Sequence, residues 1–114
     1  MYLLRMAGHQ VLIMGSMNYI EREVEGLRPD IAIIGALPNR HEIYDYTGRL
    51  MRALGHPATV LPTHWLYCSA PAWQESMTKD VGEFAQEVKV TSPGSRVIIP
   101  NCFEPNAIGP LKHQ

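Results

Sequence analysis

The chain has 114 residues, 46% of them hydrophobic, which is the length and composition of one small globular domain. Ten basic and eleven acidic residues give a formal net charge of −1 without a run of like charges, so the sequence provides no electrostatic basis for binding nucleic acid or an anionic membrane. No segment approaches the ~20 apolar residues of a membrane span, and we expect a soluble, cytoplasmic protein whose two cysteines, Cys68 and Cys102, stay reduced.

The first third of the sequence predicts a hairpin, a helix and a strand. Apolar, β-prone runs at 2–6 and 11–14 flank a segment that contains a glycine, as in a β-hairpin. At 18–27 an Asn/Glu capping pair and apolar residues at helical spacing predict a short amphipathic helix, which Pro29 ends. The uninterrupted apolar run at 31–35 indicates a strand that is covered on both faces.

A second helix and another inner strand follow. Asn39 and Glu42 form a further capping pair, and an apolar stripe continues through 43–54. The Gly-His-Pro segment at 55–57 ends this predicted helix. Residues 58–61 are apolar and β-prone, and we predict that they form the next strand of the sheet.

The last third is expected to contain one more helix and one more strand. After an irregular loop at 66–72, an apolar stripe within 77–88 predicts the helix, and 96–99 predicts the strand. We assign residues 1–100 to a single α/β half-domain and expect 101–114, which are rich in proline, glycine and asparagine, to form a loosely ordered tail.

The predicted order is a β-hairpin followed by α-β-α-β-α-β, which is an α/β layer pattern. A hairpin pairs its strands antiparallel, whereas strands joined by helices pair in parallel. We therefore predict a mixed sheet, and the fold class is α/β with an α+β-like mixed sheet.

The run at 60–65 ends in an imidazole, that of His64, at the expected end of a strand. A histidine in this place is typical either of a hydrogen-bonded structural residue or of a metal ligand at a strand end. The neighbouring motifs favour the second interpretation.

Residues 2–16 and 60–65 together resemble the C-terminal half of the metallo-β-lactamase fold, nearest to its lactonase-like metal-dependent hydrolases. In that superfamily a hairpin ends in a Gly-Asp pair whose carboxylate bridges two metal ions, and a later strand presents a metal-binding histidine. The resemblance covers nearly the whole chain and implies half of an αββα sandwich. It places Gly15 and Ser16 at the Gly-Asp pair and His64 at the last metal-binding histidine.

Two departures limit what the resemblance implies. The principal His-x-His-x-Asp-His motif of the superfamily has no counterpart, because none of the five histidines is paired at that spacing. Ser16 replaces the bridging aspartate, and a neutral hydroxyl is a much poorer ligand for two cations than a carboxylate. Zinc sites need three or four ligands, so we expect no tightly bound metal and no catalytic residue in this chain alone.

Four residues are candidates for the wall of a substrate pocket. By the resemblance, Trp65 would line the pocket and Tyr67 its entrance, although a core role for Trp65 is an equal alternative. Asn39 and Arg40 follow a strand end and are placed to reach a substrate anion, although a helix cap also explains Asn39.

The function that the resemblance implies is hydrolysis of an ester, lactone or phosphoester by hydroxide bound to zinc or another divalent cation. Because half of a sandwich exposes the inner face of its sheet, we expect either a missing N-terminal half or a homodimer that covers this face. The alternative is a non-catalytic binding or assembly module that acts as a homo-oligomer. A nucleotide-binding α/β protein is a weaker alternative, because neither glycine-rich phosphate-binding motif occurs.

Three other histidines receive local interpretations. His9 is expected at an exposed hairpin tip, His41 on the surface, and His56 in a helix-ending turn with a local role. Glu42 and Asp45, three residues apart, are expected on the solvated face of the second helix.

Overall fold

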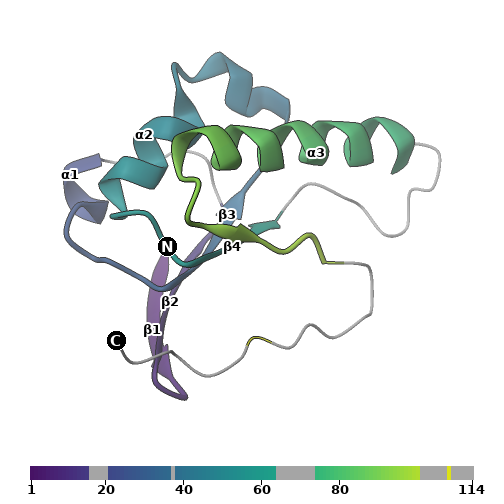
Figure 1. The fold of residues 1–114 in the computed structure, drawn as a ribbon. Helices are drawn as coiled ribbons and strands as arrows, with labels where there is room; N and C mark the ends of the chain where they lie inside the picture. Colours follow the sequence, from purple (N-terminus) through teal and green to yellow (C-terminus); the bar gives the residue numbers. More distant parts are fainter. Residues whose placement is uncertain (16–20, 37, 64–73, 101–107, 109–114) are drawn as a thin grey trace.

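The computed structural model describes residues 1–15, 21–36, 38–63, 74–100 and 108 (Figure 1). Its strands are β1 (Tyr2–Met6), β2 (His9–Met14), β3 (Ile31–Gly35), β4 (Thr59–Thr63) and β5 (Arg96–Val97). Its helices are α1 (Glu21–Val24), the 3-10 segment η1 (Pro38–Glu42), α2 (Tyr46–Ala53) and α3 (Gln74–Thr91).

The strands form one mixed sheet in the order β1-β2-β3-β4-β5. β1 and β2 pair antiparallel as a hairpin, and the other three pairs are parallel. The predicted α/β class with a mixed sheet is therefore confirmed. Each parallel connection passes through a helical segment, which is what parallel neighbours require.

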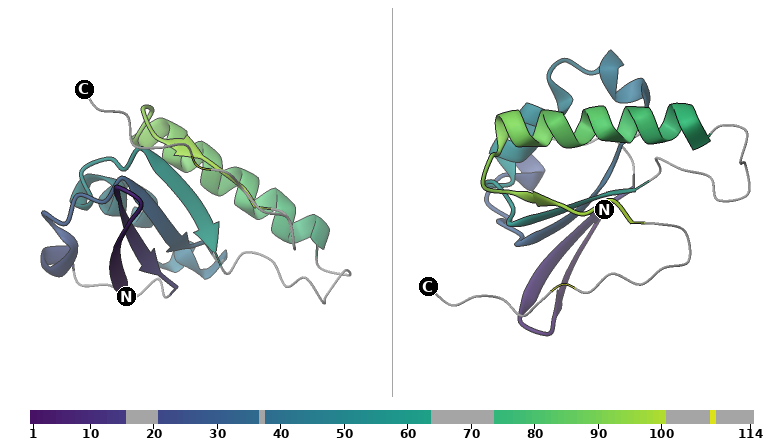
Figure 2. Two further views of the ribbon diagram at one scale, coloured as in Figure 1. Left: turned by 90° about the horizontal axis from the view of Figure 1, so that it is seen from below. Right: turned by 45° about the vertical axis from the view of Figure 1, so that its right-hand side comes forward.

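α2 and α3 cover one face of the sheet (Figures 1 and 2). Leu12, Ala32, Ile34 and Val60 point toward these helices, and all four side chains are fully buried. On the helix side the core includes Leu50, Met51, Leu54, Val81, Phe84 and Val88. Burial of each large apolar side chain contributes roughly 1.5–3 kcal/mol, so this layer contact is the main source of stability.

The opposite face of the sheet is also apolar. Side chains alternate along a strand, so Ile13, Ile33 and Leu61, which are aligned across three neighbouring strands, point away from the helices. All three are half-buried, and no helix among the described residues packs against them (Figure 2). The other four residues of β3 are buried. The described helices therefore cover only one face of β3, which the sequence predicted to be covered on both.

The second helix begins later than the sequence predicted. Asn39 lies in the 3-10 segment η1, and α2 begins at Tyr46, after Asp45, whose φ of 45° is left-handed. The prediction of Asn39 as its cap is therefore wrong. A left-handed residue interrupts the helical hydrogen-bond pattern, so the stretch from η1 to Asp45 is a separate connection, and Glu42 and Asp45 precede α2.

Other boundaries differ by a few residues. β4 continues two residues past the predicted end, whereas β5 is limited to two residues of the predicted 96–99. α1 is described only for Glu21–Val24, and residues 16–20 of the predicted helix lie outside the described residues. The predicted loop at 66–72 and most of the predicted tail at 101–114 also lie outside them. Within the described segments, no helix is long and apolar enough to cross a bilayer.

Candidate functional site

The carboxyl ends of three parallel strands, β2, β3 and β4, meet at one edge of the sheet. Met14, Ile34 and Pro62 are aligned across these strands near their ends. The predicted site residues follow directly in sequence, since Ser16 comes two residues after β2 and His64 one residue after β4. Ser16, His64, Trp65, Tyr67 and the side chain of Asn39 lie outside the described residues, so their predicted roles stay predictions.

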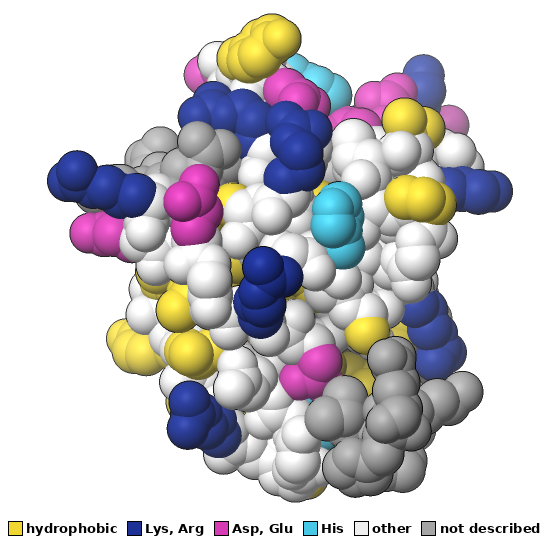
Figure 3. Space-filling view, turned by 60° about the vertical axis from the view of Figure 1, so that its left-hand side comes forward, with side chains coloured by type: hydrophobic (Ala, Val, Ile, Leu, Met, Phe, Trp, Pro, Cys, Tyr) yellow, Lys and Arg dark blue, Asp and Glu magenta, His cyan; other side chains and the backbone are white. Residues whose placement is uncertain are grey.

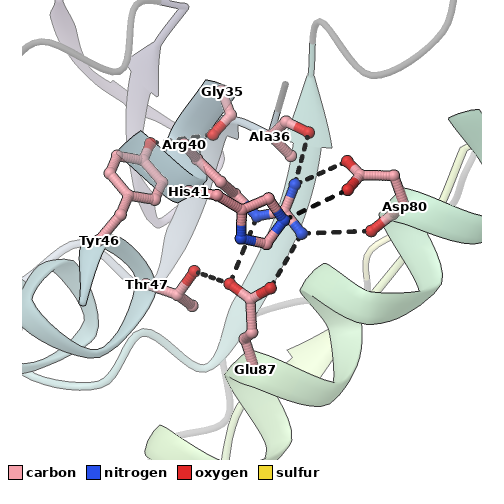
Figure 4. A network of polar contacts seen from close by, with 8 residues as sticks. All are labelled: Gly35, Ala36, Arg40, His41, Tyr46, Thr47, Asp80 and Glu87. Atoms are coloured by element: carbon pink, nitrogen blue, oxygen red, sulfur yellow. Dashed lines mark hydrogen bonds and ion pairs between the residues drawn. The ribbon is translucent and has the colours of Figure 1, made fainter. Parts of the chain in front are cut away.

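The backbone that leaves β3 at this edge is held by hydrogen bonds. The Ala36 N–H donates to the Thr63 carbonyl at 3.0 Å. The hydroxyl of the buried Tyr46 donates to the Gly35 carbonyl at 2.9 Å, and Arg40 Nη1 donates to the Ala36 carbonyl at 3.4 Å (Figure 4). Side chains from η1 and α2 therefore fix the end of the central strand.

Arg40 is the most deeply buried charged group that the structure describes, with 1% of its surface exposed. Its Nη1 donates to Asp80 Oδ2 at 2.6 Å, and its Nη2 donates to Glu87 Oε2 at 2.9 Å (Figure 4). Nε lies 3.3 Å from Glu87 Oε1, and the guanidinium carbon lies 5.7 Å from the centre of the Phe84 ring. This arrangement ties η1 to two residues of α3 that lie about two helical turns apart.

The ion pairs shift the pKa values of both partners toward the charged forms. Burial of the Arg40 guanidinium is the largest influence and lowers its pKa, but the hydrogen bonds to Glu87 and Asp80 and the nearby negative charge together raise it above the ordinary value. Burial likewise raises the pKa of Glu87 most strongly, and hydrogen bonds from Arg40 and Thr47 bring it below its ordinary value. The Thr47 hydroxyl donates to Glu87 at 2.6 Å.

The same bonds change the interpretation of Arg40. The sequence placed it in a substrate pocket, able to meet a substrate anion. In the structure two carboxylates of the chain itself hold the guanidinium, so its charge is compensated internally. Sequence spacing gives no sign of these pairs, because Arg40 lies 40 and 47 residues from its partners.

Arg40, Asp80, Glu87 and Thr47 form what we call the Arg40 cluster. A groove of about 660 Å³ lies beside it, between the η1–α2 connection and α3. Tyr44 and Val90 on its margins are 84% and 79% exposed. Its lining comprises Arg40, His41, Ile43, Tyr44, Asp45, Tyr46, Thr47, Gly48, Glu83, Gln86, Glu87, Val90 and Thr91. The groove is thus lined by both apolar and acidic side chains.

Comparison of the chain with models of known protein families, with curated proteins and with solved structures finds no match. The basis for a function is therefore the sequence motifs together with the geometry. On the face that Figure 3 shows, lysine and arginine side chains are spread among acidic and hydrophobic ones and are not gathered into one patch.

Two of the remaining histidines have partners that sequence reasoning missed. The His9 side chain is only 11% exposed, and its Nδ1 is hydrogen-bonded to the Asp30 carboxylate, so the prediction of an exposed tip is wrong. Asp30 immediately precedes β3, the neighbour of β2, and this adjacency brings the two groups together. His56 Nδ1 lies 3.0 Å from the Ser92 hydroxyl, so its contact joins the end of α2 to the end of α3 and is not local.

Proposed function

We propose that this chain supplies the C-terminal half of a metallo-β-lactamase-fold, metal-dependent hydrolase and has no hydrolytic activity by itself. The observation that carries the proposal is that the helices among the described residues cover one face of the sheet, combined with parallel strands that end at the same edge. In an αββα sandwich each half has helices on the outer face of its sheet and packs its inner face on the other half. The apolar face that bears Ile13, Ile33 and Leu61 supports this assignment.

The expected contribution of the chain to the metal site is one imidazole, that of His64. Ser16 stands where the family has a bridging carboxylate, and a single hydroxyl does not compensate the repulsion between two cations. His64 would hold zinc or another divalent cation together with ligands from the other half, and the cation would supply a water of lowered pKa, toward ~7, for hydrolysis of an ester, lactone or phosphoester. Trp65, Tyr67 and Asn39 remain the proposed pocket residues, and Arg40 acts as a structural tie.

The partner in the complete enzyme would be the missing half, which would cover the inner face of the sheet. For the isolated chain we propose a two-fold homodimer through the same face, because isologous pairing is the commonest way to bury a self-complementary apolar surface. We further propose a cytoplasmic location, where Cys68 and Cys102 remain thiols.

Hydrolysis assays test the catalytic part of the proposal. The purified chain, supplied with Zn²⁺ or Mn²⁺, is expected to give no turnover of lactone, ester or phosphoester substrates above the metal ion alone. His64→Ala is the matched variant. Metal-dependent turnover that His64→Ala abolishes, with an unchanged circular dichroism spectrum, would show that the isolated chain has a competent site and would contradict the proposal.

Sedimentation tests the proposed dimer. Ile33→Lys places a charge in the middle of the apolar face and is expected to convert a dimer into a monomer. Val90→Lys places the same charge on the exposed helix side and should leave the dimer intact. A compact wild-type monomer at micromolar concentration would rule out self-association through this face.

A second candidate function is a non-catalytic assembly module, and the exposure of β1 favours it. All five residues of this edge strand are exposed, among them Tyr2, Leu4 and Met6 at 70%, 42% and 58%. An exposed apolar edge is a template for pairing with another chain. Loss of folding in His64→Ala would favour this structural function, because a metal ligand in an open site can be removed without unfolding the chain.

A further inference from the structure

Three metal-ligating side chains lie together on the outer side of the Arg40 cluster. His41 comes from η1, and Asp80 and Glu83 come from one face of α3, three residues apart. One potential ligand atom from each lies within 4.8 Å of the other two. This group is well away in sequence from Ser16 and His64, and the function proposed above does not use it.

The separation of two of the three ligand atoms already fits a zinc-like ion. His41 Nε2 lies 3.5 Å from Asp80 Oδ1 (Figure 4). Two ligands of a tetrahedral ion with bonds of ~2.1 Å are ~3.4 Å apart, so this pair already has nearly the required separation. Glu83 is exposed, and a change of its side-chain rotamer can bring its carboxylate to the third position.

Arg40 orients the Asp80 carboxylate for metal binding. It binds Oδ2 of Asp80 at 2.6 Å and thereby holds the carboxylate with its other oxygen, Oδ1, toward His41. Such outer partners orient metal ligands in proteins. Two carboxylates, those of Asp80 and Glu87, contact the single guanidinium, and a third, that of Glu83, lies near Asp80 and His41. These four groups carry an excess of two negative charges when the imidazole is neutral.

We propose that His41, Asp80 and Glu83 form a binding site for a divalent transition-metal cation of the zinc class. A nitrogen ligand selects such ions over Mg²⁺ and Ca²⁺, which prefer oxygen ligands alone. Three protein ligands leave a fourth position for water or another donor, so the site is open and weaker than a closed four-ligand site. A bound ion would join η1 to α3 on the solvent side of the Arg40 cluster. It would thereby stabilise the wall of the neighbouring groove, which His41 and Glu83 line.

Zinc titration of the full-length chain against a chromophoric chelator tests this site. We expect one ion per wild-type chain, with affinity at least tenfold lower in His41→Ala and lower also in Glu83→Gln. His56→Ala is the control and should bind as the wild type does. His64→Ala separates this site from the proposed hydrolase site, because an ion held through His41 does not need the His64 imidazole. His41 is 55% exposed and Glu83 is exposed, so both variants are expected to fold, and far-UV circular dichroism checks this.

Cobalt supplies a second readout that is independent of activity. Co²⁺ bound through His41 should give visible absorption bands that disappear in His41→Ala and remain in His64→Ala. Absence of stoichiometric zinc binding by the wild type, equal affinity in folded His41→Ala, or loss of binding only in His64→Ala would each overturn the proposal. The result does not depend on the hydrolase proposal, which fails or succeeds on turnover that requires His64.

Discussion

Replacement of Arg40 tests whether its ion pairs hold the fold together. Arg40→Met removes the guanidinium and keeps much of its unbranched stem beside Phe84. Loss of one partner from a buried ion pair costs roughly 3–5 kcal/mol, because the other charge is left uncompensated. Here Asp80 and Glu87 are 14% and 32% exposed, so water can partly solvate them. We therefore expect a loss of about 3 kcal/mol in the free energy of unfolding.

Urea denaturation followed by far-UV circular dichroism measures this loss, and two further variants make it specific. Arg52→Met is the matched control, because Arg52 forms a 3.0 Å pair with Asp45 in which the side chains are 57% and 40% exposed. Such surface pairs contribute ~0–1 kcal/mol. Arg40→Lys should fall between the two, since an ammonium group lacks the planar fork that binds two carboxylates.

A loss of stability in Arg40→Met no larger than that in Arg52→Met would contradict this prediction. That outcome would mean that the cost of burying the guanidinium cancels the gain from its bonds. It would also remove the basis for treating Arg40 as the structural tie between η1 and α3.

The buried core, the turn after α2 and the ionisation of Glu87 each provide one further prediction. Phe84→Ala, at a fully buried position, should lower the free energy of unfolding by roughly 3–5 kcal/mol in urea titrations. Gly55→Ala should also destabilise, measurable as a lower Tm, because φ at Gly55 is 72°, a left-handed conformation that a residue with a Cβ rarely adopts. The depressed pKa of Glu87 means that its ionised form stabilises the fold above its ordinary pKa of 4.5, and that this contribution is lost as pH falls through the lower folded-state pKa. Glu87→Gln should therefore flatten the decline of stability below pH 4.5, and a decline as steep as in the wild type would contradict the assignment.

Local patterns predicted the strands and the last helix well. The hairpin, β3 and α3 appear at or within a few residues of the predicted positions, because alternation and helical spacing reflect which side of an element is buried. The start of α2 was wrong for a physical reason. The Asn39/Glu42 pair resembles a capping box, but whether a helix begins there depends on the backbone at Asp45, which adopts a left-handed conformation that the capping pattern does not reveal.

Long-range polar contacts were not predictable from spacing. Arg40 bonds to α3 across 40 and 47 residues, and His56 reaches Ser92 across 36. Nothing in the sequence near Arg40 distinguishes a buried, paired guanidinium from an exposed one that meets a substrate. The same limit applies to His41, which was correctly predicted to be exposed, whereas its proximity to Asp80 depends on how α3 packs.

The Arg40 cluster also connects the helix layer to the edge of the sheet at which β4 ends, and the proposed metal ligand His64 follows β4 in sequence. Arg40 donates to the Ala36 carbonyl, and the Ala36 N–H donates to the Thr63 carbonyl at the last residue of β4. A metal ligand needs a backbone that is held close to its productive position. The residue after Thr63 is His64, so the position of β4's end is coupled through the backbone of Ala36 and the Arg40 guanidinium to the carboxylates of α3. Loss of Arg40 should therefore weaken any metal site built on His64.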